Sequence, residues 1–290
     1  MSIQAPTGQA YPASASQRTL FDAHVHPDLM PNAREVVDEC AREGMALLAC
    51  TVTPDGWLRA RDEGMGSWPG VRLAAGAHPW WVADGRVGSE DVDMLCQAIA
   101  HDEVRLVGEV GLDFSPRRMG EGDGARAKRD AQTDAFARIA RACGDAAEAT
   151  GMPRVLSIHS VSAATQALDI LEAEGLLGDG PRACRCVFHW FSGSCDELWR
   201  AINADCWFSV GVRLLGTHRG REYCRLMPAD KILLETDLPA SFDEPCPIDA
   251  VATSLRNAVA AIARACDSTP GGVARTTTAN AEALLGSPLG

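Results

Sequence analysis

Eight short apolar runs separated by helix-like segments constrain the fold of this chain more than any other feature. The runs lie at 19–25, 45–52, 71–78, 103–112, 154–160, 185–191, 206–212 and 231–237. Segments with amphipathic helical spacing lie between them, at 32–43, 131–149, 163–175 and 247–265. Continuous apolar strands that alternate with helices indicate a parallel sheet covered by helices. A doubly wound open sheet also fits this alternation. The strand count favours an α/β fold of the (β/α)8 TIM-barrel type, for which roughly 250 residues is typical.

The chain shows no composition shift and no low-complexity linker within 20–285, so we expect one barrel domain at 19–290. The small, polar segment 1–18 is expected to be a disordered extension. No run approaches the roughly 18–20 apolar residues of a membrane span, so we expect no membrane partner. The eleven cysteines are scattered and lack a C-x-x-C pair, which indicates a reduced, cytoplasmic protein.

Side chains that can bind metal lie near the carboxyl ends of most of the apolar runs. Five of the seven histidines are among them, and only His101 and His218 are not. In a barrel, this end of the strands carries catalysis. The residues concerned are His24, His26, His78, Glu109, Asp113, His159, His189, Glu235 and Asp237.

Six of these side chains form a set that predicts a metal centre. They are His24, His26, Glu109, His159, His189 and Asp237. Six ligands exceed the needs of one tetrahedral ion but suit two divalent ions that share a bridging carboxylate. Glu109 is the natural bridge, because its strand lies between the two histidine groups. Imidazole and carboxylate ligands together admit Mg²⁺, Mn²⁺ or Zn²⁺.

Several stretches resemble the TatD-type metal-dependent deoxyribonucleases of the amidohydrolase-like barrels. They are FDAHVH, GAHPWW, LVGEVGLDF, VLSIHS, VFHWFSG, WFSVGV, KILLETDLP and TTANAEALLG, and they follow the family's order over residues 20 to 286. The resemblance implies hydrolysis of phosphodiester bonds in DNA, often from a 3′ end. It places one ion on His24, His26 and Asp237 and the other on His159 and His189, with Glu109 between them. Metal-bound water would be the nucleophile and Asp237 its proton acceptor, so Glu109 and Asp237 are the expected catalytic residues.

The substrate contacts depart from the family pattern at two places. After G-L-D, many members carry an aromatic pair and then an arginine, where this chain has FSPRR at 114–118. The family commonly has an arginine after the strand-five H-S, where this chain has Val161, so we expect Arg117 or Arg118 to contact phosphate instead. His78 is expected either to contact the scissile phosphate or to orient a neighbouring side chain. Asp113 is expected either to hold a ligand histidine or to cap the following segment.

Two aromatic sites are also open to interpretation. Trp80 and Trp81 could stack on a nucleobase or pack against the barrel. Trp190 follows a ligand histidine, and strand alternation therefore predicts that it lies in the core.

The expected substrate is a single-stranded end of DNA, cleaved by a 3′-to-5′ exonuclease. A net charge of −12 argues against broad nonspecific binding of nucleic acid, but it allows a nuclease that takes one strand end into a metal-lined cleft. GLDFSPRR, TVTPDGW and HWFSGS further resemble the TatD-like subunit of the Qat anti-phage defence systems, which implies partner proteins encoded in a defence operon.

Two alternative functions stay open. The first is an amidohydrolase that acts on a small-molecule amide, ester or lactone. Many of those enzymes carry a carbamylated lysine on strand four, where this chain has Glu109. The second is a partner-dependent barrel subunit that is inactive alone. The complete set of six ligands argues against it, because buried histidines and carboxylates are costly without a partner.

Overall fold

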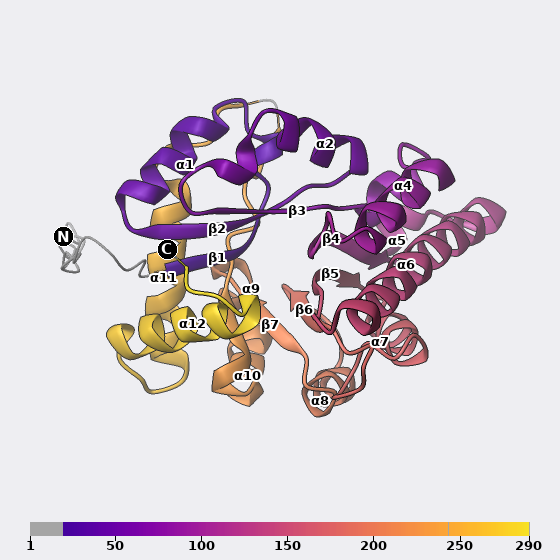
Figure 1. Ribbon diagram of the computed structural model, residues 1–290. Helices are drawn as coiled ribbons and strands as arrows, with labels where there is room; N and C mark the ends of the chain where they lie inside the picture. Colours follow the sequence, from indigo (N-terminus) through magenta and orange to yellow (C-terminus); the bar gives the residue numbers. More distant parts are fainter. Residues whose placement is uncertain (1–19, 243, 290) are drawn as a thin grey trace.

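Eight parallel strands form the centre of the molecule, and helices surround them (Figure 1). The computed structural model describes residues 20–242 and 244–289, so the extension expected at 1–18 lies outside the described residues. The strands are β1 (Leu20–Val25), β2 (Met45–Cys50), β3 (Val71–Ala74), β4 (Leu106–Asp113), β5 (Val155–Val161), β6 (Arg185–His189), β7 (Trp207–Val210) and β8 (Ile232–Leu234). Each strand lies within or overlaps one of the eight apolar runs, which confirms the predicted (β/α)8 barrel.

The sheet closes almost completely on itself. Its strand order is β3-β2-β1-β8-β7-β6-β5-β4, with parallel pairing between neighbours. The two ends of this order, β3 and β4, meet through an isolated parallel bridge between Ala75 and Val107. Two hydrogen bonds support the bridge, from Ala75 N–H to the Leu106 carbonyl (3.0 Å) and from Gly108 N–H to the Ala75 carbonyl (2.9 Å). The carboxyl ends of all eight strands therefore meet at one end of the barrel.

The helices follow the strands as expected, with one clear difference in length. The helix expected at 131–149 begins nine residues earlier, because its first turns are exposed and carry no apolar stripe from which periodicity could detect them. The helices are α1 (Ala33–Arg42), α2 (Pro54–Asp62), α3 (Pro79–Ala83), α4 (Ser89–Ala100), α5 (Pro116–Met119), α6 (Gly122–Thr150), α7 (Ala164–Ala173), α8 (Cys195–Asn203), α9 (Val212–Leu215), α10 (His218–Leu226), α11 (Ala250–Ala265) and α12 (Pro270–Leu285). Three 3-10 turns complete the set: η1 (Pro27–Leu29), η2 (Met65–Ser67) and η3 (Ala229–Lys231).

The core has two layers, which alternate along each strand. On β5, Leu156 and Ile158 belong to the larger cluster between sheet and helices, whereas Val155 belongs to a smaller cluster inside the barrel. The C-terminal helix α12 adds Ala281 and Leu284 to the inner cluster and packs against β1 and β8. Apolar packing therefore fills the amino end of the barrel, and the carboxyl end is left for polar side chains.

Two strands break the alternation with a bulge. On β1, Asp22 pairs with Leu47 of β2, but Val25 pairs with Ala49, so β1 holds one extra residue over this stretch. β4 has a similar irregularity against β5 between Val107 and Val110. A bulge re-aims the side chains that follow it. Both bulges lie next to residues of the predicted metal set, His24 and Glu109.

No helix among the described residues is long and apolar enough to cross a bilayer.

Candidate metal centre

Glu109 lies at the centre of the polar end of the barrel, with 1% of its surface exposed. Its backbone N–H donates to the Thr51 carbonyl (2.9 Å), and its carbonyl accepts from Ala77 N–H (2.9 Å). Gly76 packs into this junction. A Cβ atom at Gly76 would lie 1.8 Å from the Thr51 carbonyl oxygen and 2.6 Å from the Glu109 nitrogen. Only glycine fits there, so the backbone that follows β3 can approach β4 and fix the position of Glu109.

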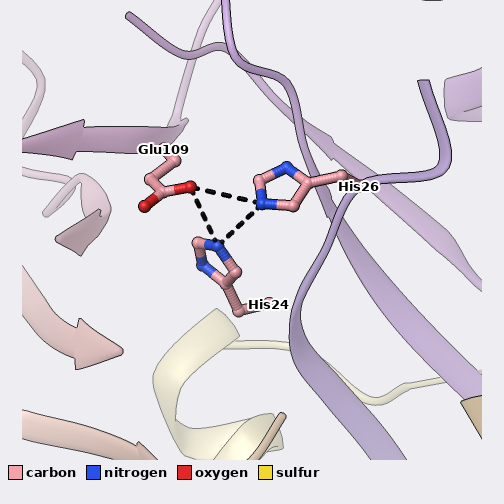
Figure 2. A group of neighbouring side chains, drawn as sticks. All are labelled: His24, His26 and Glu109. Atoms are coloured by element: carbon pink, nitrogen blue, oxygen red, sulfur yellow. Dashed lines mark hydrogen bonds and ion pairs between the residues drawn. The ribbon is translucent and has the colours of Figure 1, made fainter. Parts of the chain in front are cut away.

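One carboxylate oxygen of Glu109 faces the first histidine pair. Glu109 Oε2 lies 3.2 Å from Nε2 of His24 and 3.2 Å from Nε2 of His26, and the two nitrogens are 3.2 Å apart (Figure 2). Asp237, just beyond β8, places Oδ1 3.5 Å from His26 Nε2 and 3.9 Å from His24 Nε2. Four of the predicted ligands therefore converge on one point.

The outer nitrogen of His26 shows which tautomer it adopts. His26 Nδ1 lies 2.6 Å from the Cys50 carbonyl oxygen, which can only accept, so Nδ1 carries the proton. In the neutral imidazole, the Nε2 lone pair then points at two carboxylates, an arrangement that requires a positive charge between them. Burial alone would lower the pKa of His26, but hydrogen bonding and charge from Asp237 and Glu109 raise it well above its usual value. A divalent cation would supply the same charge.

The other oxygen of Glu109 faces the second histidine pair. Glu109 Oε1 lies 2.6 Å from Nδ1 of His159 and 2.8 Å from Nε2 of His189, and these nitrogens are 3.4 Å apart. The outer nitrogen of His189 is buried and has no hydrogen-bond partner among the described residues; Glu235 Oε2 lies 3.8 Å from it. Burial would raise the pKa of Glu109, but His78, His189 and His24 together hold it well below its usual range. Glu109 is therefore an ionised carboxylate that lies between the two histidine pairs.

Asp113 contacts both His159 and the turn that leads into α5. Its Oδ2 lies 3.3 Å from His159 Nε2 and accepts from the indole N–H of Trp80 (2.6 Å). Its Oδ1 accepts from the N–H of Ser115, the residue just before α5 (2.8 Å). Burial would lower the pKa of His159, but the carboxylates of Asp113 and Glu109 raise it to about 9.

His78 differs from His26 in its tautomer. Its Nδ1 accepts a hydrogen bond from the Trp80 backbone N–H (3.0 Å), so the proton of the neutral ring is on Nε2. Burial lowers the pKa of His78 to about 4, which keeps the ring neutral. Its Nε2 lies 3.3 Å from Glu109 Oε1. His78 is therefore a hydrogen-bond donor aimed into the centre.

A pocket of about 510 Å³ opens above these residues. Arg117 and Arg118 line it, as does Arg213 from the start of α9. Arg118 lies over Trp80, with its guanidinium carbon 3.5 Å from the ring centroid. Arg219, by contrast, hydrogen-bonds the Gly193 carbonyl.

Trp190 is not in the core, and the prediction from strand alternation is wrong at this position. It is 37% exposed and lines the pocket. β6 ends at His189, and Trp190 adopts a positive φ of 40°, so period-two alternation no longer applies to it. Its backbone N–H donates to Glu235 Oε1 (3.1 Å), which gives that buried carboxyl a structural role.

Sequence reasoning missed the residues that hold the ligands in place. Ser157 Oγ lies 2.6 Å from His24 Nδ1, and Gln132 of α6 accepts from the Asp113 backbone N–H (2.7 Å). Asp22 joins β1 to β8, accepting from the backbone N–H groups of His24 and Thr236, both at 3.1 Å. Ser157 was detectable, since it lies two residues before His159 on the same strand face. Gln132 carried no such signal.

Comparisons with known proteins agree on one family. The profile described as "TatD related DNase" matches residues 21–286. The protein named "Uncharacterized metal-dependent hydrolase TatD" of Mycobacterium tuberculosis is 30% identical over 283 residues, which covers 92% of this chain and 98% of that protein. Human "Deoxyribonuclease TATDN3" is 26% identical over 231 residues, covering 76% of this chain and 78% of that protein.

Two further relatives extend this result. The "3'-5' ssDNA/RNA exonuclease TatD" of Escherichia coli is 27% identical over 168 residues, covering 57% of this chain and 56% of that protein. The crystal structure of a TatD family hydrolase from Entamoeba histolytica superposes with a TM-score of 0.68 at 13% identity. It covers 92% of this chain and 98% of that one, and it supports the fold.

Proposed function

This chain belongs to the TatD-related DNase family of metal-dependent hydrolases, and we propose that it is a 3′-to-5′ exonuclease that removes nucleotides from single-stranded ends of DNA. The observation that carries the proposal is the position of Glu109 between two histidine pairs. Its two oxygens face different pairs at 2.6–3.2 Å, as expected for a carboxylate that bridges two cations. The relative from Escherichia coli, named as an exonuclease of ssDNA and RNA, supports the direction and the substrate.

The donor set fits two divalent ions. We assign one to His24, His26 and Asp237 and the other to His159 and His189, with Glu109 shared. Two such cations would polarise a phosphoryl oxygen and activate a water molecule. Imidazole and carboxylate donors fit Mg²⁺, Mn²⁺ or Zn²⁺.

The protein's own side chains would then move the proton and hold the substrate. Burial would raise the pKa of Asp237, but the hydrogen bond to His26 and the nearby histidines hold it below its usual value. The carboxylate is therefore ionised and able to accept a proton from the attacking water. His78 would donate its Nε2 proton in a hydrogen bond to a phosphoryl oxygen, and Arg117 or Arg118 would balance the phosphate charge.

The pocket favours a strand end over a duplex. Its ligands are buried at the end of the barrel, and a volume of about 510 Å³ is within the range of small-ligand sites. The net charge of −12 opposes attraction of a long polyanion to the whole surface. Three arginines and three carboxylates line the pocket, so a net positive charge there would come from the cations that the six ligands would hold.

The decisive experiment follows end-labelled single-stranded DNA with Mg²⁺ or Mn²⁺ and with EDTA. Wild type should shorten a 5′-labelled strand stepwise, whereas a 3′ label should appear at once as a mononucleotide. Glu109→Ala should abolish the reaction, and Glu103→Gln should not, because Glu103 is exposed and outside the pocket. A wild-type protein that holds two metals but leaves every strand intact would overturn the proposal and favour a small-molecule amidohydrolase.

A role in anti-phage defence, partner proteins from a defence operon and a cytoplasmic location stay predictions. A pull-down from cells that express the neighbouring genes, with and without phage, would test the first two.

A further inference from the structure

The aromatic side chains around the pocket differ in how much of their ring surface is free. Trp80 is covered by Arg118 and anchored to Asp113 through its indole N–H. Trp81 is covered by Arg86, whose guanidinium carbon lies 4.5 Å from the ring centroid. Trp190, by contrast, is 37% exposed. Arg213 also lies near Trp190, with its guanidinium carbon 5.3 Å from the ring centroid, but Trp190 is the most exposed of the three rings, because Trp80 and Trp81 are only partly exposed.

The outward position of Trp190 depends on dedicated contacts. A bulky residue with a positive φ is uncommon and needs support from its surroundings. Here Glu235, buried beside the metal centre, accepts from the Trp190 backbone N–H at 3.1 Å and from the Ser209 hydroxyl at 2.5 Å. Buried polar groups therefore hold a large apolar ring toward water, which is unfavourable unless a ligand covers the ring.

Arg213 connects this ring to the metal centre. Its guanidinium carbon lies 5.3 Å from the Trp190 ring centroid, and its Nη1 lies 3.2 Å from Asp237 Oδ2. Among the described residues, Asp237 is the only group that accepts a hydrogen bond from Arg213. A guanidinium has five N–H donors, so donors are left for an anion, and the side chain is 42% exposed on the pocket wall.

We propose that Trp190 and Arg213 form a nucleotide subsite beside the metal centre, in which a nucleobase stacks on the indole and the guanidinium binds the adjoining phosphate. This subsite rests on the proposed nuclease function and specifies how the strand is held. Every base can stack on an aromatic ring, so the subsite would bind the strand without sequence specificity. Arg213 would contact the phosphate and Asp237 at the same time, which places the bound nucleotide next to the expected proton acceptor.

The test is a scan with abasic oligonucleotides. A set of single-stranded DNAs carries one abasic position each, moved stepwise from the 3′ end, and kcat/KM is measured for wild type and variants. Wild type should lose roughly 5- to 100-fold at one position, the loss expected when one stacked base is removed. Trp190→Ala should lose a similar factor on intact DNA and become insensitive to that same abasic position. Trp190→Phe should keep both the activity on intact DNA and the sensitivity to that abasic position, because it retains an aromatic ring.

The matched control is Trp199→Ala, since Trp199 is 45% exposed on α8 but outside the pocket. It should keep the wild-type profile. If Trp190→Ala loses as much activity at the abasic position as wild type does, the subsite is overturned. It is also overturned if wild type has no sensitive position, and this second outcome is measured on wild type alone, so it does not depend on whether a variant folds. Binding of the same strands, measured by fluorescence anisotropy, separates the two proposals. If wild type binds but never cleaves, the nuclease proposal fails while the subsite is still tested by the change in affinity at each abasic position.

Discussion

The metal centre is built from two kinds of strand. β5 and β6 follow simple alternation, and it brings Ser157, His159 and His189 to the inside of the barrel. β1 and β4 carry a bulge each, directly beside His24 and Glu109. Without its bulge, β4 would place Glu109 on the outer face that Val107 occupies. Regular strands therefore place their polar residues as their pattern predicts, whereas on the bulged strands one extra residue turns His24 and Glu109 inward.

The centre has two halves, the pair His24 and His26 on the side of the bulged strand β1 and the pair His159 and His189 on the side of the regular strands β5 and β6. The halves also differ in how the ring nitrogens that face away from Glu109 are held. On the bulged side, His26 is fixed to the Cys50 carbonyl at 2.6 Å and His24 to Ser157 at 2.6 Å. On the regular side, His159 is held by Asp113 at 3.3 Å, and the outer nitrogen of His189 has no partner among the described residues. We infer that the pair formed by His24 and His26 is the more rigid of the two and would hold a metal ion more tightly.

Glu109→Gln should weaken metal binding in both halves of the centre and should therefore have the largest effect on activity. The amide keeps the shape of the side chain but loses the negative charge that two cations would share in the proposed centre. We expect kcat to fall at least about 1,000-fold, because metal ions contribute several kcal/mol of transition-state stabilisation and each 1.4 kcal/mol is tenfold. Metal analysis of the purified protein should drop from two ions per chain to one or none. Retention of two ions with near-normal activity would contradict the bridging role.

Asp237→Asn affects the first half and the proton acceptor. We expect a decrease in kcat of about 10²- to 10⁴-fold, the range for loss of a general base. The second ion should stay bound, because His159, His189 and Glu109 are unchanged. The exposed carboxylate Asp93 gives a control, and Asp93→Asn should leave kcat and metal content as in wild type. Loss of both ions in Asp237→Asn would show that the halves do not bind independently.

Asp113→Asn sharpens the comparison from the regular side. It removes the charge that orients His159, and groups of this kind typically contribute about 10- to 100-fold to metal affinity or activity. Titration with a chelator should release the more weakly held ion at a lower chelator concentration than in wild type. Equal release of both ions would argue that Asp113 acts on the fold as a whole.

Ser157→Ala tests the bulged side and should have the smallest effect. His24 loses its outer hydrogen bond, worth about 0.5–1.5 kcal/mol, so kcat/KM should fall only several-fold. The bulge and the neighbouring strands would still aim the ring. If Ser157→Ala proved as damaging as Asp113→Asn, the proposed difference in rigidity would be wrong.

Much of this protein could be predicted from local sequence patterns. Alternating apolar runs and helices gave the barrel, because each run must be buried on both faces of a parallel sheet. The polar residues that follow these runs gave the metal set, since parallel strands end on the same side. Asp113 was also predictable as a neighbour of that set. These features depend only on the spacing of residue types along one chain segment.

The remaining features depend on contacts between distant segments. The bulges arise from pairing with neighbouring strands, so no count along β1 or β4 alone shows that His24 and Glu109 turn inward. Trp190 leaves the core because Glu235, 45 residues away, holds its backbone at a positive φ. Arg213 is a loop charge in the sequence and a partner of Asp237 in the structure. The sequence thus determined which groups the site contains, and only tertiary packing decided where each of them points.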